Sequence, residues 1–263
     1  MTIDYSEQQQ LFSEKFDRFT QMLKRKSSVA VLTGAGVSTL SNIPDFRGTG
    51  GVYTKKYGNL SVEDILHIDF FHRHPEIFYQ WAGEVWFRLE QYEPNVVHRM
   101  VAMMEHEGLI DGVFTQNIDM LHQRAGSANV WEVHGSPMHN HCTVCGREYS
   151  YRDIVATASQ GKVPRCECGG VIKPDIILYG ESLDQKLLAR AEEVFGYKCD
   201  LCIVLGSSLN VSPVNLLPRM AVSHGSSLVI VNAQDTSLDG YCDIRFRDLK
   251  QFSEAVIEYL GKR

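Results

Sequence analysis

The spacing of apolar residues along the chain predicts several amphipathic helices. Over residues 5–26 one helical face would carry Leu11, Phe12, Phe16, Phe19, Met22 and Leu23. A second helix is expected over 96–104, with Gly108 placed where a helix ends. A third closes the chain over 249–260.

Continuous apolar runs separate these helices and predict buried strands. The four runs lie at 29–32, 112–115, 201–205 and 228–231. Short apolar strands that alternate with helices are typical of a parallel sheet covered on both faces. We therefore expect an α/β fold built on a parallel sheet.

Two segments depart from this alternation. Residues 48–93 are rich in aromatic side chains and helical in pattern, and residues 137–173 hold four of the seven cysteines. We interpret both as insertions that form a smaller second domain. The sheet domain would then consist of 1–47, 94–136 and 174–263.

Composition narrows the class of protein. The 263 residues include 44% apolar and 22% charged ones, with a formal net charge of −6. This balance fits a globular protein and argues against a nucleic-acid partner, which would call for clustered basic residues. No apolar run approaches the ~18–20 residues of a membrane span. The first ten residues lack the pattern of a signal peptide. We expect a cytoplasmic protein without a membrane partner.

A glycine turn follows the first predicted strand. Gly34 and Gly36 flank Ala35 there, and such a turn lets the backbone approach a diphosphate. A dehydrogenase fingerprint would have a third glycine where Thr39 stands, and no acidic residue occurs in 46–62. A standard dehydrogenase half is therefore disfavoured, and a simple tight turn is the alternative.

The loop after this turn combines an acid, an aromatic ring and a guanidinium, in Asp45, Phe46 and Arg47. Arginine can bind phosphate or carboxylate with two parallel hydrogen bonds. The phenyl ring could cover a heteroaromatic ring. The alternative is a surface loop in which Asp45 pairs with Arg47.

Polar residues also follow the other predicted strands. Gln116, Asn117 and Asp119 follow the strand at 112–115, where an Asn/Asp turn with a helix cap is the alternative. The remaining positions of this kind are Gly206, Ser207, Ser208 and Asn232. Because the carboxyl ends of parallel strands meet at one edge, these residues predict a dinucleotide-sized cleft. His134 ends another short apolar stretch, and its imidazole could act as a base near neutral pH.

Four cysteines form two closely spaced pairs, Cys142, Cys145, Cys166 and Cys168. The spacing resembles a structural zinc ribbon with four thiolates. The second pair is C-x-C, one residue short, so its turn must be tighter. His139 and His141 flank the first pair as substitute ligands. A redox C-x-x-C pair is the alternative, which the second pair weakens. The other three cysteines are interpreted as packing residues.

Taken together, these motifs resemble the sirtuin family. The resemblance rests on 34–38, 43–48, 115–119, His134-Gly135, the two cysteine pairs and 206–208, and it spans about residues 27–260. It implies a Rossmann-like domain with a smaller domain made of a helical insertion and a zinc ribbon. The compact length is similar to that of bacterial members. One departure is Asn42, which stands where the family usually has glycine.

The resemblance implies that NAD is bound and consumed as a co-substrate. The residues that would bind it are Gly34, Ala35, Gly36, Thr39, Asp45, Phe46, Arg47, Gln116, Asn117, Ile118, Asp119, His134, Gly206, Ser207, Ser208, Asn232 and Leu249. The catalytic residues would be His134, as the general base, with Asn117 and Asp119. An acyl-lysine protein or peptide would pair with the segment Ile177, Leu178 and Tyr179 and, on the facing side, with Val211. One structural zinc would occupy the four thiolates.

The implied activity is NAD-dependent protein-lysine deacylation, which releases nicotinamide and O-acyl-ADP-ribose. A mono-ADP-ribosyltransferase that uses the same cleft is the first alternative. A non-catalytic NAD sensor or a zinc-ribbon nucleic-acid module is the second. Sirtuins that prefer acidic acyl groups carry a Tyr-x-x-Arg pair, and the matching positions here are Tyr79 and Ala82. Neutral acyl groups are therefore expected.

Overall fold

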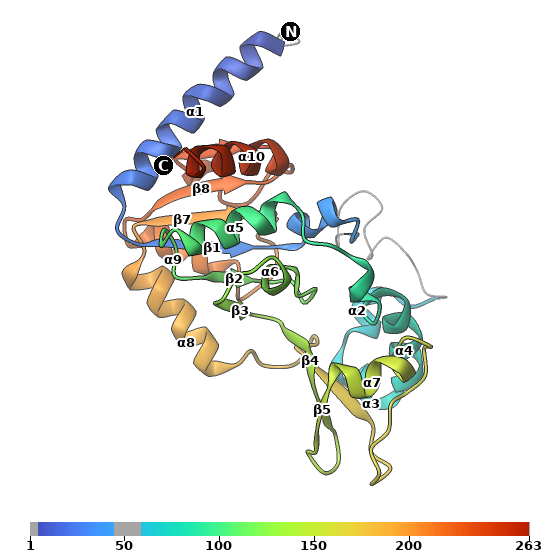
Figure 1. The fold of residues 1–263 in the computed structure, drawn as a ribbon. Helices are drawn as coiled ribbons and strands as arrows, with labels where there is room; N and C mark the ends of the chain where they lie inside the picture. Colours follow the sequence, from blue (N-terminus) through green and yellow to red (C-terminus); the bar gives the residue numbers. More distant parts are fainter. Residues whose placement is uncertain (1–4, 45–58, 263) are drawn as a thin grey trace.

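The computed structural model describes residues 5–44 and 59–262 (Figure 1). One sheet contains the parallel strands β1 (Val29–Thr33), β2 (Val113–Thr115), β3 (Val130–Glu132), β7 (Leu201–Leu205), β8 (Ser227–Val231) and β9 (Ile244–Phe246). Their order is β3-β2-β1-β7-β8-β9. The predicted α/β class is confirmed, and the four predicted strands are β1, β2, β7 and β8.

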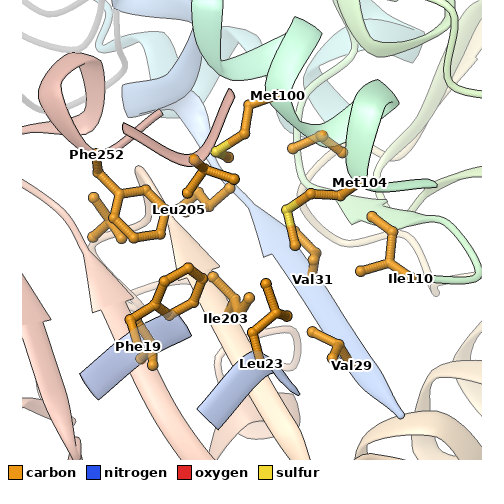
Figure 2. Packing of buried hydrophobic residues seen from close by; sticks show 14 of the residues in the cluster. Phe19, Leu23, Val29, Val31, Met100, Met104, Ile110, Ile203, Leu205 and Phe252 are labelled. Atoms are coloured by element: carbon orange, nitrogen blue, oxygen red, sulfur yellow. The ribbon is translucent and has the colours of Figure 1, made fainter. Parts of the chain in front are cut away.

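Helices cover both faces of this sheet because successive side chains of each strand point to opposite sides. One face packs against α1 (Tyr5–Arg25), α5 (Val96–His106) and α10 (Leu249–Leu260). Figure 2 shows Phe19, Met100 and Phe252 of these helices around Val31 and Ile203. The other face packs against α8 (Gln185–Glu193), η4 (Val194–Lys198) and α9 (Leu216–Ser223).

The predicted apolar face of the first helix is not covered along its whole length. Leu11 is 43% exposed. In Figure 1 the N-terminal part of α1 projects away from the body of the molecule. The packing begins at the next residue, Phe12, whose ring centroid lies 5.5 Å from that of Phe246.

A second unit lies beside the parallel sheet. Its three-stranded antiparallel sheet has the order β5-β4-β6 and contains β4 (Gly135–Cys142), β5 (Glu148–Ser150) and β6 (Ile172–Ile176). The helices packed with it are α2 (Val62–Ile65), α3 (Ile68–Arg73), α4 (Pro75–Val85), η3 (Leu89–Gln91) and α7 (Tyr151–Ala158). Phe78, Ile154 and Ile172 belong to its own hydrophobic core. The domain boundaries themselves stay a prediction.

The order of the strands reverses next to β1. The chain places β2 and β3 on one side of β1, and β7, β8 and β9 on the other. Such a switch point is where open α/β sheets bind ligands, outside the carboxyl ends of the strands. The glycine turn leads there into the short helix η1 (Ala35–Ser41). Asn42 ends η1 with a φ of 63°, so this side chain does occupy a left-handed position.

Within the described residues, no helix combines the length and the apolar character needed to cross a membrane.

Candidate active site

A cavity of about 600 Å³ opens at the switch point, between the two units. The predicted site residues that line it are Ala35, Gly36, Thr39, Gln116, Asn117, Ile118, His134, Ile177, Leu178, Tyr179, Gly206, Ser207, Ser208, Val211, Asn232 and Leu249. Its volume lies within the range of small-molecule sites. The structure thus brings together residues that lie up to 214 positions apart in the chain.

Two glycine-containing loops touch at the floor of this cavity. The Gly36 amide donates a hydrogen bond to the Gly206 carbonyl oxygen at 2.8 Å. A Cβ atom on Gly36 would lie 2.8 Å from that same oxygen. Gly206 itself has a φ of +61°, a conformation that favours glycine. The glycines are therefore required by this close approach of the ends of β1 and β7.

A buried polar network lies behind the cavity lining. Asn117 donates through Nδ2 to Gly34 O at 3.1 Å and to Ser38 Oγ at 2.9 Å. The Ser38 hydroxyl in turn donates to Asp119 Oδ2 at 2.5 Å. The amide of Leu121, the first residue of α6 (Leu121–Arg124), donates to Asp119 Oδ1 at 2.9 Å. Asn117 alone of this network reaches the lining, so Asp119 would act through it.

Burial controls the ionisation of this network. Asp119 is 7% exposed, and burial raises the pKa of its carboxyl, although the hydrogen bonds from Ser38 and Leu121 oppose the rise. The two oxygens of the carboxyl are fixed by these two donors. Asp119 can orient the polar groups that face the cavity without itself facing solvent.

His134 enters the cavity from the loop between β3 and β4. Its Nδ1 lies 2.9 Å from the carbonyl oxygen of Gln116. A carbonyl oxygen accepts only, so Nδ1 carries the hydrogen and Nε2 holds the free lone pair. Burial lowers the pKa of His134 below its ordinary value of 6.5. A neutral imidazole with one basic nitrogen is the form that a general base requires.

Side chains from two strand ends meet across β1. Gln116 follows β2 and donates through Nε2 to Ser207 Oγ, which follows β7, at 2.9 Å. The Ser207 hydroxyl also accepts from the amide of Leu209 at 3.2 Å. Both of these polar residues line the cavity.

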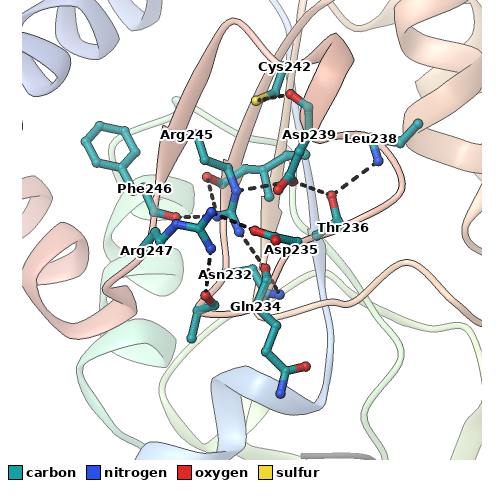
Figure 3. Close-up of polar contacts among 12 residues, drawn as sticks. Asn232, Gln234, Asp235, Thr236, Leu238, Asp239, Cys242, Arg245, Phe246 and Arg247 are labelled. Atoms are coloured by element: carbon teal, nitrogen blue, oxygen red, sulfur yellow. Dashed lines mark hydrogen bonds and ion pairs between the residues drawn. The ribbon is translucent and has the colours of Figure 1, made fainter.

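The loop after β8 forms the far end of the cavity, where Asn232 and Gln234 lie (Figure 3). Asn232 Nδ2 donates to Gln234 O at 2.9 Å, and so does Arg245 Nη2 at 2.5 Å. Arg247 donates to the Ala233 oxygen at 3.0 Å. Neither arginine was predicted to support the site, because charged residues in this part of the sequence resemble ordinary surface residues.

The predicted substrate segment is partly engaged within the protein. The Tyr179 amide donates to Leu66 O at 2.9 Å, and the Tyr179 carbonyl accepts from the Ile68 amide at 2.9 Å. The Ile177 amide donates to His134 O at 2.9 Å. A peptide therefore has to pair with other backbone groups of this segment than those of Tyr179.

Some predicted residues lie elsewhere. Asp45, Phe46 and Arg47 fall outside the described residues. Gly34 and Asp119 lie behind the lining rather than in it. Conversely, the lining includes apolar residues that the sequence analysis did not single out, Leu66, Trp86, Leu183 and Leu188. Nothing in their local sequence distinguishes them from core residues.

The four cysteines of the two pairs converge. Their sulfur atoms all lie within 4.8 Å of one another, with 3.5 Å between Cys142 and Cys168 and 3.6 Å between Cys145 and Cys166. Tetrahedral zinc with Zn–S bonds of about 2.3 Å needs sulfur atoms about 3.8 Å apart. The short C-x-C pair therefore still reaches the metal position.

The surroundings of Cys142 fit a thiolate ligand. Hydrogen bonds from the backbone amides of Cys145 and Val144 hold the pKa of Cys142 below its ordinary value. His139 and His141 are not part of the ligand group, which among the described residues consists of the four cysteines, and His141 Nδ1 instead lies 2.5 Å from Asp175 Oδ1. Four thiolates leave no open coordination position, so the zinc is structural.

A parallel sheet with glycine turns at its switch point, and a zinc ribbon beside the cleft, together define a dinucleotide-binding α/β protein. Comparison with known proteins makes this specific. The model of the Sir2 family matches residues 34–213. The chain belongs to the Sir2 family, as the sequence motifs predict.

Curated relatives are similar over nearly their whole length. An NAD-dependent protein deacetylase of Thermotoga maritima is 42% identical over 249 residues, which are 94% of this chain and 99% of that protein. The NAD-dependent protein deacetylase of Oceanobacillus iheyensis is 38% identical, over 87% of this chain and 93% of that protein. The chain is therefore an enzyme of the NAD-dependent protein deacetylase and deacylase type, and the alternative of a transferase or a non-catalytic module is not favoured.

Solved structures agree with this assignment. A Sir2 structure with a deacetylated p53 peptide and 3′-O-acetyl ADP ribose has a TM-score of 0.86 and 40% identity, covering 92% of this chain and 97% of that chain. Sir2Tm bound to a propionylated peptide has a TM-score of 0.84 and 39% identity, covering 95% and 100%.

Proposed function

We propose that this enzyme removes acyl groups from lysine side chains of proteins, with NAD and the acyl-lysine meeting beside His134. Acyl-lysine, NAD and water are converted to lysine, nicotinamide and O-acyl-ADP-ribose. The observation that carries the proposal is the common cavity lined by the glycine turn, by Gln116 and Asn117, and by His134.

The residues on the sheet side would hold NAD. The turn at Ala35 and Gly36 would lie against the diphosphate, because glycine lets the backbone approach it closely. Gln116 and Ser207 would contact ribose at the centre of the cavity. Asn232 would contact the adenosine half, on the loop that Arg245 holds.

His134 would take up the proton that the reaction releases at the ribose hydroxyls. Its Nδ1 is committed to the Gln116 oxygen, so the proton arrives at Nε2. The structure of the cavity, half closed between two units, would limit the access of water to the reacting centre.

Neutral acyl groups fit this cavity best. Among the described residues that line it there is no lysine or arginine to pair with an acidic acyl group. Tyr79 and Ala82 are fully buried in the core of the second unit, and Tyr79 donates its hydroxyl to Ile172 O. An acetyl or other short apolar group would instead meet Ile118 and Trp86.

The test compares acetylated and unmodified forms of one lysine peptide in the presence of NAD. Nicotinamide release should depend on the acetyl group, and His134→Ala should lower the rate about 10²–10⁴-fold, the usual contribution of a general base. Nicotinamide release at equal rates from both peptides would favour the transferase instead.

We also propose the cytoplasm as the compartment of this enzyme. Seven cysteines, four of them gathered for a metal, suit a compartment that keeps thiols reduced. Fractionation of cells followed by immunodetection tests this.

A further inference from the structure

A lysine is buried next to segment 176–181, which contains the predicted substrate residues 177–179. Lys173 lies on β6 and is 4% exposed. Its ammonium donates to Pro174 O at 3.1 Å and to Ile176 O at 3.0 Å, and it pairs with Glu181 Oε2 at 2.9 Å. An ammonium has three donors, so this set satisfies all of them.

Glu181 lies at the other end of segment 176–181 and is hydrogen-bonded back to Leu178. The oxygen that accepts from Lys173 also accepts from the Leu178 amide at 2.8 Å. The Glu181 amide donates back to Leu178 O at 3.0 Å. Between them, Gly180 turns the chain with a φ of +90°. The ion pair therefore fixes the carbonyl of Ile176 and the amide of Leu178, on either side of Ile177.

The position of this pair connects it to the proposed reaction. Ile177 bonds through its amide to the His134 carbonyl, and Tyr179 bonds to Leu66 of the helical insertion. Glu181 lines the same cavity as His134, whereas Lys173 does not reach it. The contacts around Gln116, Ser207 and Asn232 come from other strand ends and do not involve either residue.

We infer that Lys173 and Glu181 form a clamp that sets the shape of segment 176–181 for binding the acyl-lysine peptide, as positioning residues that act through Ile177 and Leu178. The inference rests on the proposed function and adds which residues give the enzyme its affinity for the peptide. A buried ion pair gains little stability over apolar side chains of the same size, because both charges lose their hydration. The effect of the ion pair here is to fix the backbone conformation next to His134.

The experiment compares Lys173→Met and Glu181→Gln with the wild-type enzyme, using an acetylated peptide and NAD. The KM for peptide should rise about tenfold, which corresponds to ~1.4 kcal/mol. The KM for NAD should change less than about twofold, since the NAD side keeps its contacts. Lys173→Arg retains a charged donor and should restore most of the peptide affinity.

A matched control is Lys198→Met, which breaks the exposed pair of Lys198 with Glu193 and should leave both KM values unchanged. Equal rises in both KM values, or an unchanged KM for peptide, would overturn the clamp. If Lys173→Met does not fold, Glu181→Gln alone tests the clamp, because the Glu181 side chain is 26% exposed and its replacement is easier to accommodate.

Equilibrium binding of a fluorescent acetylated peptide without NAD separates the clamp from the proposed function. Weaker binding by the variants supports the clamp even if the wild-type enzyme shows no deacylation, which would contradict the function. Unchanged binding by the variants of an active enzyme overturns the clamp alone.

Discussion

Asp119 is buried and His134 is half-buried beside the cavity, and burial moves their pKa values in opposite directions. The pKa of the imidazole falls and that of the carboxyl rises, because burial disfavours the charged form of each group. One group is thereby free to accept a proton, and the other is stabilised by donors from Ser38 and Leu121. Both pKa shifts are caused by the place of the residue in the structure rather than by its residue type.

The lowered pKa of His134 predicts the acid limb of the pH profile. The base is active when neutral, so kcat/KM should stay level at neutral pH and fall as the pH drops below the ordinary value of 6.5. Steady-state rates between about pH 5 and pH 9 measure this limb. His106→Gln, at an exposed position on α5, should leave the profile unchanged. A midpoint above that of a free histidine would contradict the assignment.

Asp119→Asn should change the pH dependence of stability and lower activity. A raised native pKa means that ionising Asp119 costs stability as the pH rises from 3.8 through the native value. Because asparagine does not ionise, the variant should lose this fall in melting temperature with rising pH. Its kcat/KM should fall about tenfold, since an amide offers one acceptor oxygen to the two donors Ser38 and Leu121, and an unsatisfied buried donor costs ~1–3 kcal/mol. A melting temperature that falls with pH as much as in the wild type would contradict the raised pKa.

At the scale of elements, the site depends on how closely the ends of β1 and β7 approach. The Gly34 amide bonds to Leu205 O at 3.0 Å, and the next contact is that of Gly36 with Gly206. A Cβ atom on Gly34 would lie 2.8 Å from that of Ser207. The two loops therefore pack directly against each other, and this contact fixes the positions of the polar side chains that follow each strand.

Gly36→Ala should force these two loops apart. We expect the free energy of unfolding to fall by ~1–3 kcal/mol, the usual cost of an added methyl group in a packed site, together with a higher KM for NAD. Urea denaturation and NAD titration measure the two effects. Gly261→Ala is the control, because its Cβ would meet Ile257 O at 3.4 Å, an ordinary contact. Equal stabilities for the two variants would show that the approach is not tight.

At the scale of the whole molecule, the cavity lies between two units with separate cores. Phe19, Met100 and Ile203 belong to the core of the parallel sheet, whereas Cys142 and Cys166 belong to the core that includes Tyr79. The zinc ligands thus support the unit that supplies Leu66, Trp86 and the substrate segment. The NAD contacts that we propose come from residues at the strand ends of the parallel sheet.

Removal of zinc should affect the two units unequally. A chelator should expose the amides of β4, β5 and β6 to hydrogen exchange and abolish peptide turnover, because structural zinc contributes directly to folding. The amides of β1, β7 and β8 should exchange more slowly, since those strands keep their own core. Hydrogen exchange followed by mass spectrometry, with the zinc content measured in parallel, tests this. Simultaneous exchange of both units would show a single cooperative unit.

Much of the architecture was predictable because its signals are local. The continuous apolar run at 201–205 marks a strand buried on both faces, and β7 has those bounds. Spacing alone placed the four cysteines in one metal site. The polar residues after successive strands, such as Gln116 and Ser207, had to meet because parallel strands end at one edge.

Other features could not be predicted because they arise from contacts between distant segments. Leu66 and Trp86 are apolar residues of the insertion, and their place in the cavity follows from the packing of that unit against the sheet. Leu11 shares the periodicity of its helix, yet it is exposed. Periodicity shows which residues share a helical face, but not how far along the helix that face is covered by the sheet.

The sequence by itself determined the class of fold, the family, the metal ligands and the polar groups at the strand ends, because periodicity, turn glycines and ligand spacing act over a few residues. The tertiary structure alone decided which ring nitrogen of His134 carries the proton, in which direction burial shifts the pKa of Asp119, and that Lys173 pairs with Glu181 next to residues 177–179. Those properties depend on burial and on partners brought from elsewhere in the chain, which exist only once the two units have packed.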